Sequence, residues 1–400
     1  MSHDHAHAHQ GGHVPPSPPR VRRTVLAIIV PLVVATLVGL VVLWPRGAAP
    51  TKATDDVPRV RGTVVTATGP CAVGTAPTLG GSCGNATVEA DGQTVAATIP
   101  SGASAPQVSS GDKVVLVVTE DPADPSKTLY SIVDHDRTTA MIWLVALFAA
   151  VIIAFGRWQG LASLGGLAVS FAVLFVFVLP AIQRGESPLW VAIVGSSVIM
   201  FAVLYLTHGI NVQTTVAVLG TLGALALTGL LGLAVTDVMY LTGGGSDESV
   251  ILANVLPGID LRGLLLAGII IGTLGVLDDV TVTQAAIVSE LAAANPSLSA
   301  RHLYTAALRV GRAHIGSAVN TIILAYAGAS LPLLLLIVTA GTHTRDVLTT
   351  QQMSTEIVRG VVGTLGLVAA VPLTTVLAAW LTSLAHRAAA PPAPAAAPPS

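Results

Sequence analysis

The sequence predicts a mostly helical membrane protein, a polytopic bundle of about eight transmembrane helices with a small β-rich domain between the first two. Two observations lead to this prediction. Of the 400 residues, 52% are hydrophobic and only 10% are charged, whereas soluble chains carry about 25% charged residues. Most of the apolar content lies in runs of about 18 residues or more, the length that a helix needs to cross a bilayer.

The first 24 residues are predicted to be a disordered cytoplasmic tail, because they contain too little apolar surface to build a core. Imidazoles gathered on a flexible segment suit zinc, copper or nickel. The tail is therefore either a loosely selective divalent-metal chelator or a solvated segment without a metal role, and no other cofactor is expected. The histidines concerned are His3, His5, His7, His9 and His13.

Residues 25–43 form the first predicted span. The run is longer than a signal-peptide core of about 7–15 residues, and no small-residue cleavage site follows it, so we interpret it as an uncleaved anchor. Arg20, Arg22 and Arg23 precede it and place the N-terminus in the cytoplasm.

Residues 44–139 are then expected outside the cytoplasm, as an OB-like barrel or a sandwich. Strand-like runs at 59–69, 85–99, 112–121 and 128–136 are separated by Gly, Pro and Asp turns. The only cysteines, Cys71 and Cys83, fall in this segment, where a disulfide is expected and two free thiols are the alternative.

Residues 140–385 hold seven further predicted spans, and an Ala/Pro-rich tail (386–400) is expected to be disordered. A cytoplasmic N-terminus and eight spans return the C-terminus to the cytoplasm. The basic residues Arg157, Arg301, Arg309 and Arg312 then face inward, as the positive-inside rule requires. We expect a bacterial cytoplasmic membrane protein surrounded by lipid, with no nucleic-acid partner. The spans are 140–155, 161–182, 189–207, 212–235, 263–282, 317–340 and 357–381.

The segment 260–290 carries the main candidate site. Asp278 and Asp279 lie in an apolar run, where a charge costs at least ~2.5–3.5 kcal/mol. Helical spacing puts Asp279 on a face of small and polar residues, which permits close helix approach or lines a polar cavity. Asp278 points about 100° away. The other residues of the Asp279 face are Gly268, Gly272, Gly275, Thr283, Ala286 and Glu290.

Further residues could complete this site. Gln284 follows on the same helix, and Asn320 lies in the next span. Acids inside a membrane need partners, and the basic connector before residue 317 offers Arg309, Arg312 and His314. The alternative interpretation is that this connector is simply solvated.

No enzymatic activity is expected. The sequence contains no Walker A loop, HExxH motif, kinase signature or G-x-S-x-G elbow. Adjacent acids also diverge too far to share one proton in the manner of an aspartyl protease.

Two runs resemble the YibE/F-like family of bacterial multi-pass membrane proteins: RGLLLAGIIIGTLGVLDDVTVTQAAIVSEL (262–291) and RVGRAHIGSAVNTIILAYAGASLPLLLL (309–336). The resemblance covers roughly residues 130–385, and LGVLDDVTVTQ is its most specific part. It implies the architecture above, with transport as the suggested function and no substrate. It directs attention to Asp278, Asp279, Thr281, Thr283, Gln284 and Asn320.

Our leading hypothesis is a secondary transporter or permease of an unidentified small solute or ion, coupled to protons or cations. Asp279 would be the proton or cation ligand, Asp278 its neighbour or a salt-bridge partner, and Asn320 would complete the site. The alternative is a non-transporting scaffold or assembly factor whose β domain binds an envelope partner and whose acids pair with arginines. Divalent-metal transport is a narrower form of the first hypothesis, although carboxylates favour manganese or magnesium and histidines favour zinc or nickel.

Overall fold

A computed structural model describes residues 19–47, 57–67, 82–100, 106–121, 124–339 and 344–389. The chain divides into two compact units, residues 51–160 on one side and residues 1–50 with 161–400 on the other. The five tail histidines and Cys71 lie outside the described residues, and the side chain of Cys83 is not described. The metal and disulfide predictions therefore stay predictions.

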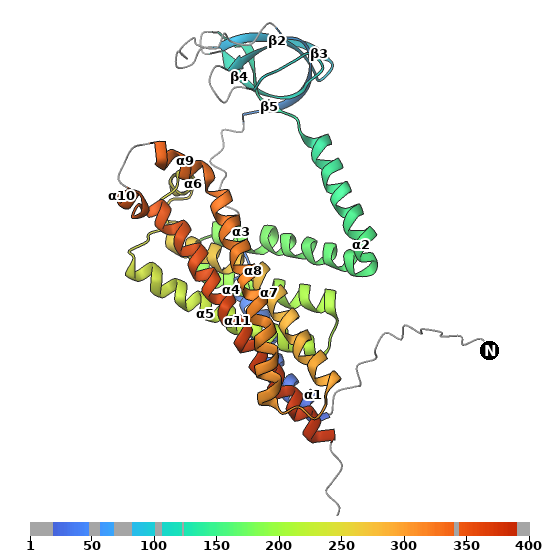
Figure 1. The fold of residues 1–400 in the computed structure, drawn as a ribbon. Helices are drawn as coiled ribbons and strands as arrows, with labels where there is room; N and C mark the ends of the chain where they lie inside the picture. Colours follow the sequence, from blue (N-terminus) through green and yellow to red (C-terminus); the bar gives the residue numbers. More distant parts are fainter. Residues whose placement is uncertain are drawn as a thin grey trace, which may run out of the picture. The chain divides into compact units, whose positions relative to one another are not determined.

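The smaller unit contains a closed five-stranded barrel, drawn in blue to teal (Figure 1). Its order is β1-β2-β3-β5-β4, in which β3 and β5 pair in parallel and all other neighbours are antiparallel. The small β-barrel is thus confirmed, with a connectivity compatible with an OB-like barrel. The strands are β1 (Arg59–Ala67), β2 (Ser82–Ala90), β3 (Gln93–Pro100), β4 (Lys113–Asp121) and β5 (Asp124–His135).

The interior of the barrel is formed by alternate strand residues, as the period of two demands. Val64, Val88, Leu116 and Ile132 are buried there. The run 85–99, predicted as one strand, is a hairpin. Asp91 and Gly92 adopt φ of 50° and 74°, and such a two-residue turn reverses the chain between β2 and β3.

After β5 the chain is helical from Thr138 to Gln183, through α2 (Thr138–Val173), the π-helical turn η1 (Leu174–Val178) and α3 (Leu179–Gln183). Arg157 interrupts α2 with φ 49° and ψ −123°. A Cβ on Gly160 would lie 2.3 Å from the carbonyl oxygen of Ile152, so the interruption requires glycine there. The spans predicted at 140–155 and 161–182 are therefore separated by a break within one helical run, without a loop.

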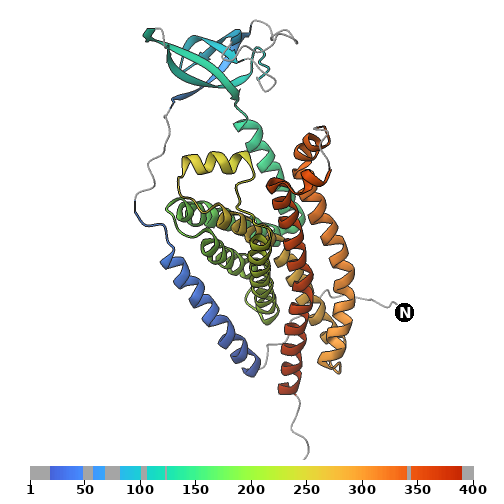
Figure 2. The same cartoon turned by 90° about the vertical axis from the view of Figure 1, so that its left-hand side faces the viewer.

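The larger unit is a helical bundle (Figures 1 and 2). Besides the helical run that ends in α3, it contains α1 (Pro19–Val42), α4 (Pro188–His208), α5 (Val212–Val238), α6 (Asp247–Val255), α7 (Leu261–Ala294), α8 (Ala300–Ala329), α9 (Leu331–Thr339), α10 (Thr344–Leu348) and α11 (Gln351–Ala389). Short connections join α3 to α4, α4 to α5 and α7 to α8, whereas the short helix α6 lies between α5 and α7, and α9 and α10 lie between α8 and α11.

Six of the described helices are long and apolar enough to cross a membrane: 22–42, 138–183, 188–208, 212–238, 261–294 and 351–384. The prediction of several apolar spans is confirmed. The count of eight and the membrane topology stay predictions. The run 138–183 holds two of the predicted spans, and the span 317–340 is divided between α8 and α9 at Ser330.

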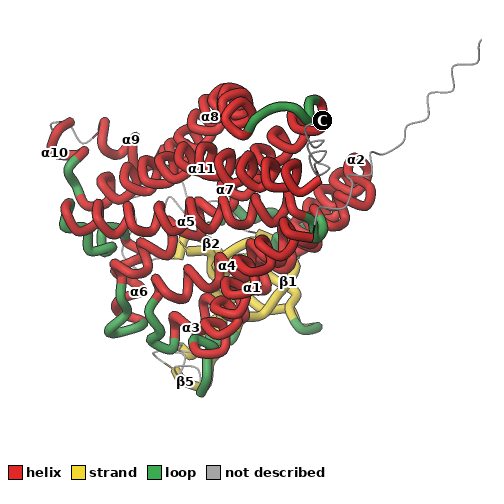
Figure 3. Tube along the Cα trace, turned by 90° about the horizontal axis from the view of Figure 1, so that it is seen from below, coloured by secondary structure: helices red, strands yellow, loops and turns green. Residues whose placement is uncertain are grey.

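Helix α7 is central, because α4, α5, α8 and α11 all pack against it (Figure 3). Two apolar clusters mark the ends of the bundle. At one end, which we call the α6 end, Leu40, Val191 and Leu264 belong to a cluster around Phe177. At the opposite end, α1, α5, α7, α8 and α11 meet in a cluster that includes Val25, Val216, Val288, Leu303 and Leu381.

Candidate functional site

A row of buried polar side chains crosses the bundle near the predicted acid pair. We call Thr221, Thr281, Gln284 and Thr375 the polar row, and each is at most 2% exposed. The hydroxyl oxygens of Thr221 and Thr281 lie 2.6 Å apart and join α5 to α7. The Gln284 amide donates to Thr375 Oγ1 at 2.7 Å and to the carbonyl of Ala307 at 3.1 Å, which joins α7 to α11 and α8.

Threonine and glycine complement each other where α5 crosses α11. A Cβ on Gly220 would lie 2.1 Å from Thr374 Oγ1, and a Cβ on Gly366 would lie 1.9 Å from Thr228 Oγ1. Each glycine therefore makes room for a threonine of the other helix, and the backbones approach closely. Thr374 is fully buried, and its hydroxyl has no hydrogen-bond partner among the described residues.

The two acids of α7 lie in different surroundings. Asp278 is half-buried, and the backbone N–H of Asp279 donates to its Oδ1 at 2.8 Å. It shares a side of α7 with Leu264 and Ile271, which pack toward η1, α3 and α4. Asp279 is exposed. The two adjacent acids therefore point in different directions from α7, so that Asp278 is more enclosed than Asp279.

Asp279 continues an open stripe along α7. Gly268, Gly272 and Gly275 are exposed like Asp279, and a Cβ on Gly268 or Gly275 would meet no atom within 4 Å. At Gly272 the nearest atom would be the hydroxyl oxygen of Tyr326 from α8, at 3.3 Å. Farther along the same face, Thr283 and Ala286 are half-buried and Glu290 is exposed.

The predicted partners of the acids do not pair with them. Six ion pairs occur among the described residues, and none involves Asp278, Asp279 or Glu290. Arg309, Arg312 and His314 are exposed along α8. Asn320 is also exposed and makes no described hydrogen bond, whereas Gln284 is buried within the polar row.

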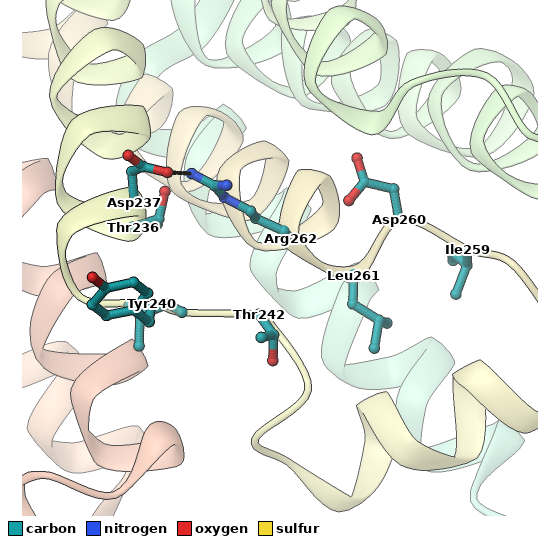
Figure 4. Close-up of a pocket in the computed structure, with 9 residues that line it drawn as sticks. Thr236, Asp237, Tyr240, Thr242, Ile259, Asp260, Leu261 and Arg262 are labelled. Atoms are coloured by element: carbon teal, nitrogen blue, oxygen red, sulfur yellow. Dashed lines mark hydrogen bonds and ion pairs between the residues drawn. The ribbon is translucent and has the colours of Figure 1, made fainter.

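Two cavities lie at the α6 end, where sequence reasoning placed no site. The larger, about 490 Å³, is lined by the end of α5 and the start of α7. Figure 4 shows the Asp237 carboxylate directed at Arg262, with 3.2 Å between the paired atoms. Tyr240, Thr242 and Asp260 also border this cavity.

The smaller cavity, about 210 Å³, is lined by the 243–249 segment and by the starts of α7 and α11. Arg359 donates to Glu356 at 2.9 Å inside it. The Glu356–Arg359 pair could have been found from the sequence, because an acid and an arginine three residues apart at the start of an apolar span mark an ion pair on one helix face. Only the packing, however, reveals that they border a cavity.

Comparison with known proteins covers most of the helical region. The model of the YibE/F-like protein family matches residues 144–384, which is more than half of the chain. The chain belongs to this family. The family match includes the polar row, both acids of α7 and both cavities, and it excludes the barrel and α1. No curated protein and no solved structure gives a significant match.

Proposed function

We propose that this YibE/F-like chain is a membrane transporter or permease for a small solute or ion, coupled to protons or cations. One observation carries the proposal: two adjacent carboxylates on the central helix have no ion-pair partner among the described residues. An unpaired acid in a membrane span is costly and is generally kept for an ion pathway or a proton relay. The neighbouring polar row supports such a pathway.

The two acids have different proposed roles. Asp279, on the open stripe, is the accessible group that exchanges a proton or cation with the surroundings. Asp278, half-buried beside it, is the group that passes charge toward the interior of the bundle, one turn from Thr281 and the polar row. Thr283 and Asn320 are candidates for additional oxygen ligands.

The proposed orientation is based on the distribution of arginines. The end opposite α6 carries Arg22, Arg23, Arg301, Arg309 and Arg312, with Glu290 as an acid there. We therefore propose that this end faces the cytoplasm of a bacterium and that the α6 end faces outward, in accord with the positive-inside rule.

The test is proton movement in everted membrane vesicles that contain the full chain. After acidification of the vesicle interior, a panel of ions and small solutes, manganese, magnesium, zinc and nickel included, is added in turn while a pH-sensitive dye reports proton efflux. At least one compound should release protons with wild-type protein. Asp279→Asn and Asp278→Asn should abolish the release, and Glu290→Gln should preserve it. Full activity of both asparagine variants, or no response to any compound, would contradict the proposal.

The scaffold hypothesis remains the second candidate, and the closed barrel favours it, because five-stranded barrels of this type commonly serve as binding modules. It requires the α7 acids to act only on stability, through ion pairs with arginines. A double-mutant cycle between Asp279 and Arg312 decides this point. A coupling energy in stability, combined with unchanged proton movement, would favour the scaffold.

A further inference from the structure

The smaller cavity at the α6 end is bordered by two residues that each have a buried hydrogen-bond donor without an acceptor among the described residues. Arg359 Nε and Thr355 Oγ1 are both buried atoms without a hydrogen-bond partner among the described residues, although both side chains as a whole are partly exposed. They are four residues apart on α11, so they lie on one helix face, and both border the cavity. A buried donor without an acceptor is destabilising, and two such donors on one helix face fit an oxyanion.

The guanidinium of Arg359 is already oriented. Its Nη1 donates to Glu356 Oε1 at 2.9 Å, and both side chains are about one-third exposed or less, at 31% and 26%. This ion pair fixes the plane of the guanidinium and leaves Nε–H free to donate to a carboxylate. An arginine held in this way recognises a planar anion with little loss of side-chain freedom.

A negative charge borders the same cavity. Glu248, from the first turn of α6, is exposed at its rim. The pKa of this carboxyl lies below its ordinary value, because its own backbone N–H and the Ser246 hydroxyl donate hydrogen bonds to it. Glu248 is therefore ionised near neutral pH, and a simple anion at Arg359 would meet its repulsion.

From this arrangement we propose that the cavity binds a small zwitterion, a molecule of the size of glycine or alanine. Its carboxylate accepts from Arg359 Nε–H and Thr355 O–H, and its ammonium group lies toward Glu248. The volume of about 210 Å³ is below the roughly 300–1,000 Å³ of pockets for drug-sized ligands, which limits the occupant to a few non-hydrogen atoms. Leu252, Leu261 and Leu265 supply the apolar wall.

The cavity lies at the end of the bundle away from the α7 acids, so the inference does not depend on transport. It can be tested by equilibrium binding of radiolabelled glycine and alanine to the full-length protein in lipid nanodiscs, with acetate and methylammonium as competitors at constant ionic strength. Saturable binding of glycine or alanine is expected, and each competitor should be at least tenfold weaker than the unlabelled zwitterion.

Two variants test the individual contacts. Thr355→Val keeps the shape of the side chain and removes one donor. It should weaken glycine binding roughly five- to tenfold, as the loss of one hydrogen bond does. Thr355→Ser keeps the hydroxyl and should bind glycine like the wild type. Glu248→Gln should abolish the preference for glycine over acetate. Arg262→Gln is the matched control, because Arg262 is an ion-paired arginine with a buried, unpartnered Nε in the other cavity, and it should bind glycine normally.

Several outcomes would overturn the inference. They are the absence of saturable binding, competition by acetate or methylammonium as strong as that by glycine, and Thr355→Val protein that binds like the wild type. Because binding is measured without a gradient, a protein that binds glycine but moves no protons would count only against the proposed transport.

Discussion

Gly311 on α8 lies against the amide that holds three helices together. A Cβ at this position would be 2.6 Å from Gln284 Oε1 and 2.7 Å from a methyl group of Val371. The Gln284 amide cannot easily move, because it donates to Ala307 and Thr375. We predict that Gly311→Ala destabilises the protein by about 1–3 kcal/mol, the usual cost of overpacking a buried site, as measured by unfolding in mixed micelles.

Gly316 provides the control for this substitution. It lies on the same helix, but a Cβ there would meet no atom within 4 Å. Alanine in a helix is favoured over glycine by roughly 0.5–1 kcal/mol, so Gly316→Ala should be neutral or slightly stabilising. Equal effects of the two substitutions would contradict the packing around Gln284.

At the scale of residues, helical spacing predicts which side chains of the candidate site share one face of α7. The spacing of Gly268, Gly272, Gly275 and Asp279 fixes their common direction. In the structure all four are exposed, so spacing gave the direction of this face but not what covers it. The burial of Gln284 could not be predicted. Periodicity gives the angle between residues on a helix, whereas burial depends on which other helix covers each direction.

At the scale of elements, the crossing of α5 and α11 depends on two glycines. We predict that Gly220→Ala destabilises the bundle by about 1–3 kcal/mol, because the new methyl group would occupy the place of the Thr374 hydroxyl, 2.1 Å from its oxygen. The same unfolding measurement in mixed micelles tests this.

Gly223, one turn farther along α5, has open space at the Cβ position and supplies the comparison. Gly223→Ala should not destabilise. The double variant Gly220→Ala with Thr374→Ala should recover part of the lost stability, because the shorter side chain vacates the space. No recovery would indicate that the cost of Gly220→Ala arises elsewhere than at α11.

The connection between the barrel and α2 should respond to pH. Asp136 accepts from the side-chain hydroxyl and backbone N–H of Thr138 at the start of α2, with Arg61 of β1 nearby, and these contacts hold the pKa of Asp136 below its ordinary value of 3.8. A lowered folded-state pKa stabilises the native form above the ordinary value, and this stabilisation is lost as pH falls through the lowered pKa.

We therefore expect Asp136→Ala to increase hydrogen exchange in the first turn of α2 at pH 6, and we expect this effect to shrink progressively as the pH falls below 3.8, the ordinary pKa of the carboxyl, once intrinsic rates are corrected. Glu89→Gln, an exposed acid on β2, should leave α2 unchanged across this pH range. A constant effect of Asp136→Ala at all pH values would show that its carboxylate charge is irrelevant.

Individual elements were predictable to different degrees. The β-barrel and the apolar spans follow from the alternation and length of hydrophobic runs. The turn at Asp91 and Gly92 carries an Asp-Gly signal that identifies the hairpin. The sequence placed an interruption between residues 155 and 161, but it did not predict that the helix continues through it with a positive φ at Arg157, because such a conformation at a non-glycine residue is maintained by its surroundings.

At the scale of the whole molecule, the family match covers all of the candidate sites in the bundle. The residues matched by the family model, 144–384, contain the polar row, the acid pair and the two cavities, which lie at different levels between the ends of one bundle. A solute that enters at the α6 end and charge that is exchanged at the α7 acids would use separate sites on one central helix.

The orientation of the bundle can be tested directly by cysteine labelling. In a chain with Cys71→Ser and Cys83→Ser, single cysteines are introduced as Glu186→Cys at the α6 end and Ser297→Cys at the opposite end. Because the opposite end carries Arg22, Arg23, Arg301, Arg309 and Arg312, we expect it to face the cytoplasm, in accord with the positive-inside rule. An impermeant maleimide should therefore label the first variant in intact cells and the second only after permeabilisation. The reverse pattern would place the zwitterion cavity in the cytoplasm and the α7 acids toward the outside. Labelling of both variants in intact cells would place both positions on the same side of the membrane, so that the helices between them would cross it an even number of times.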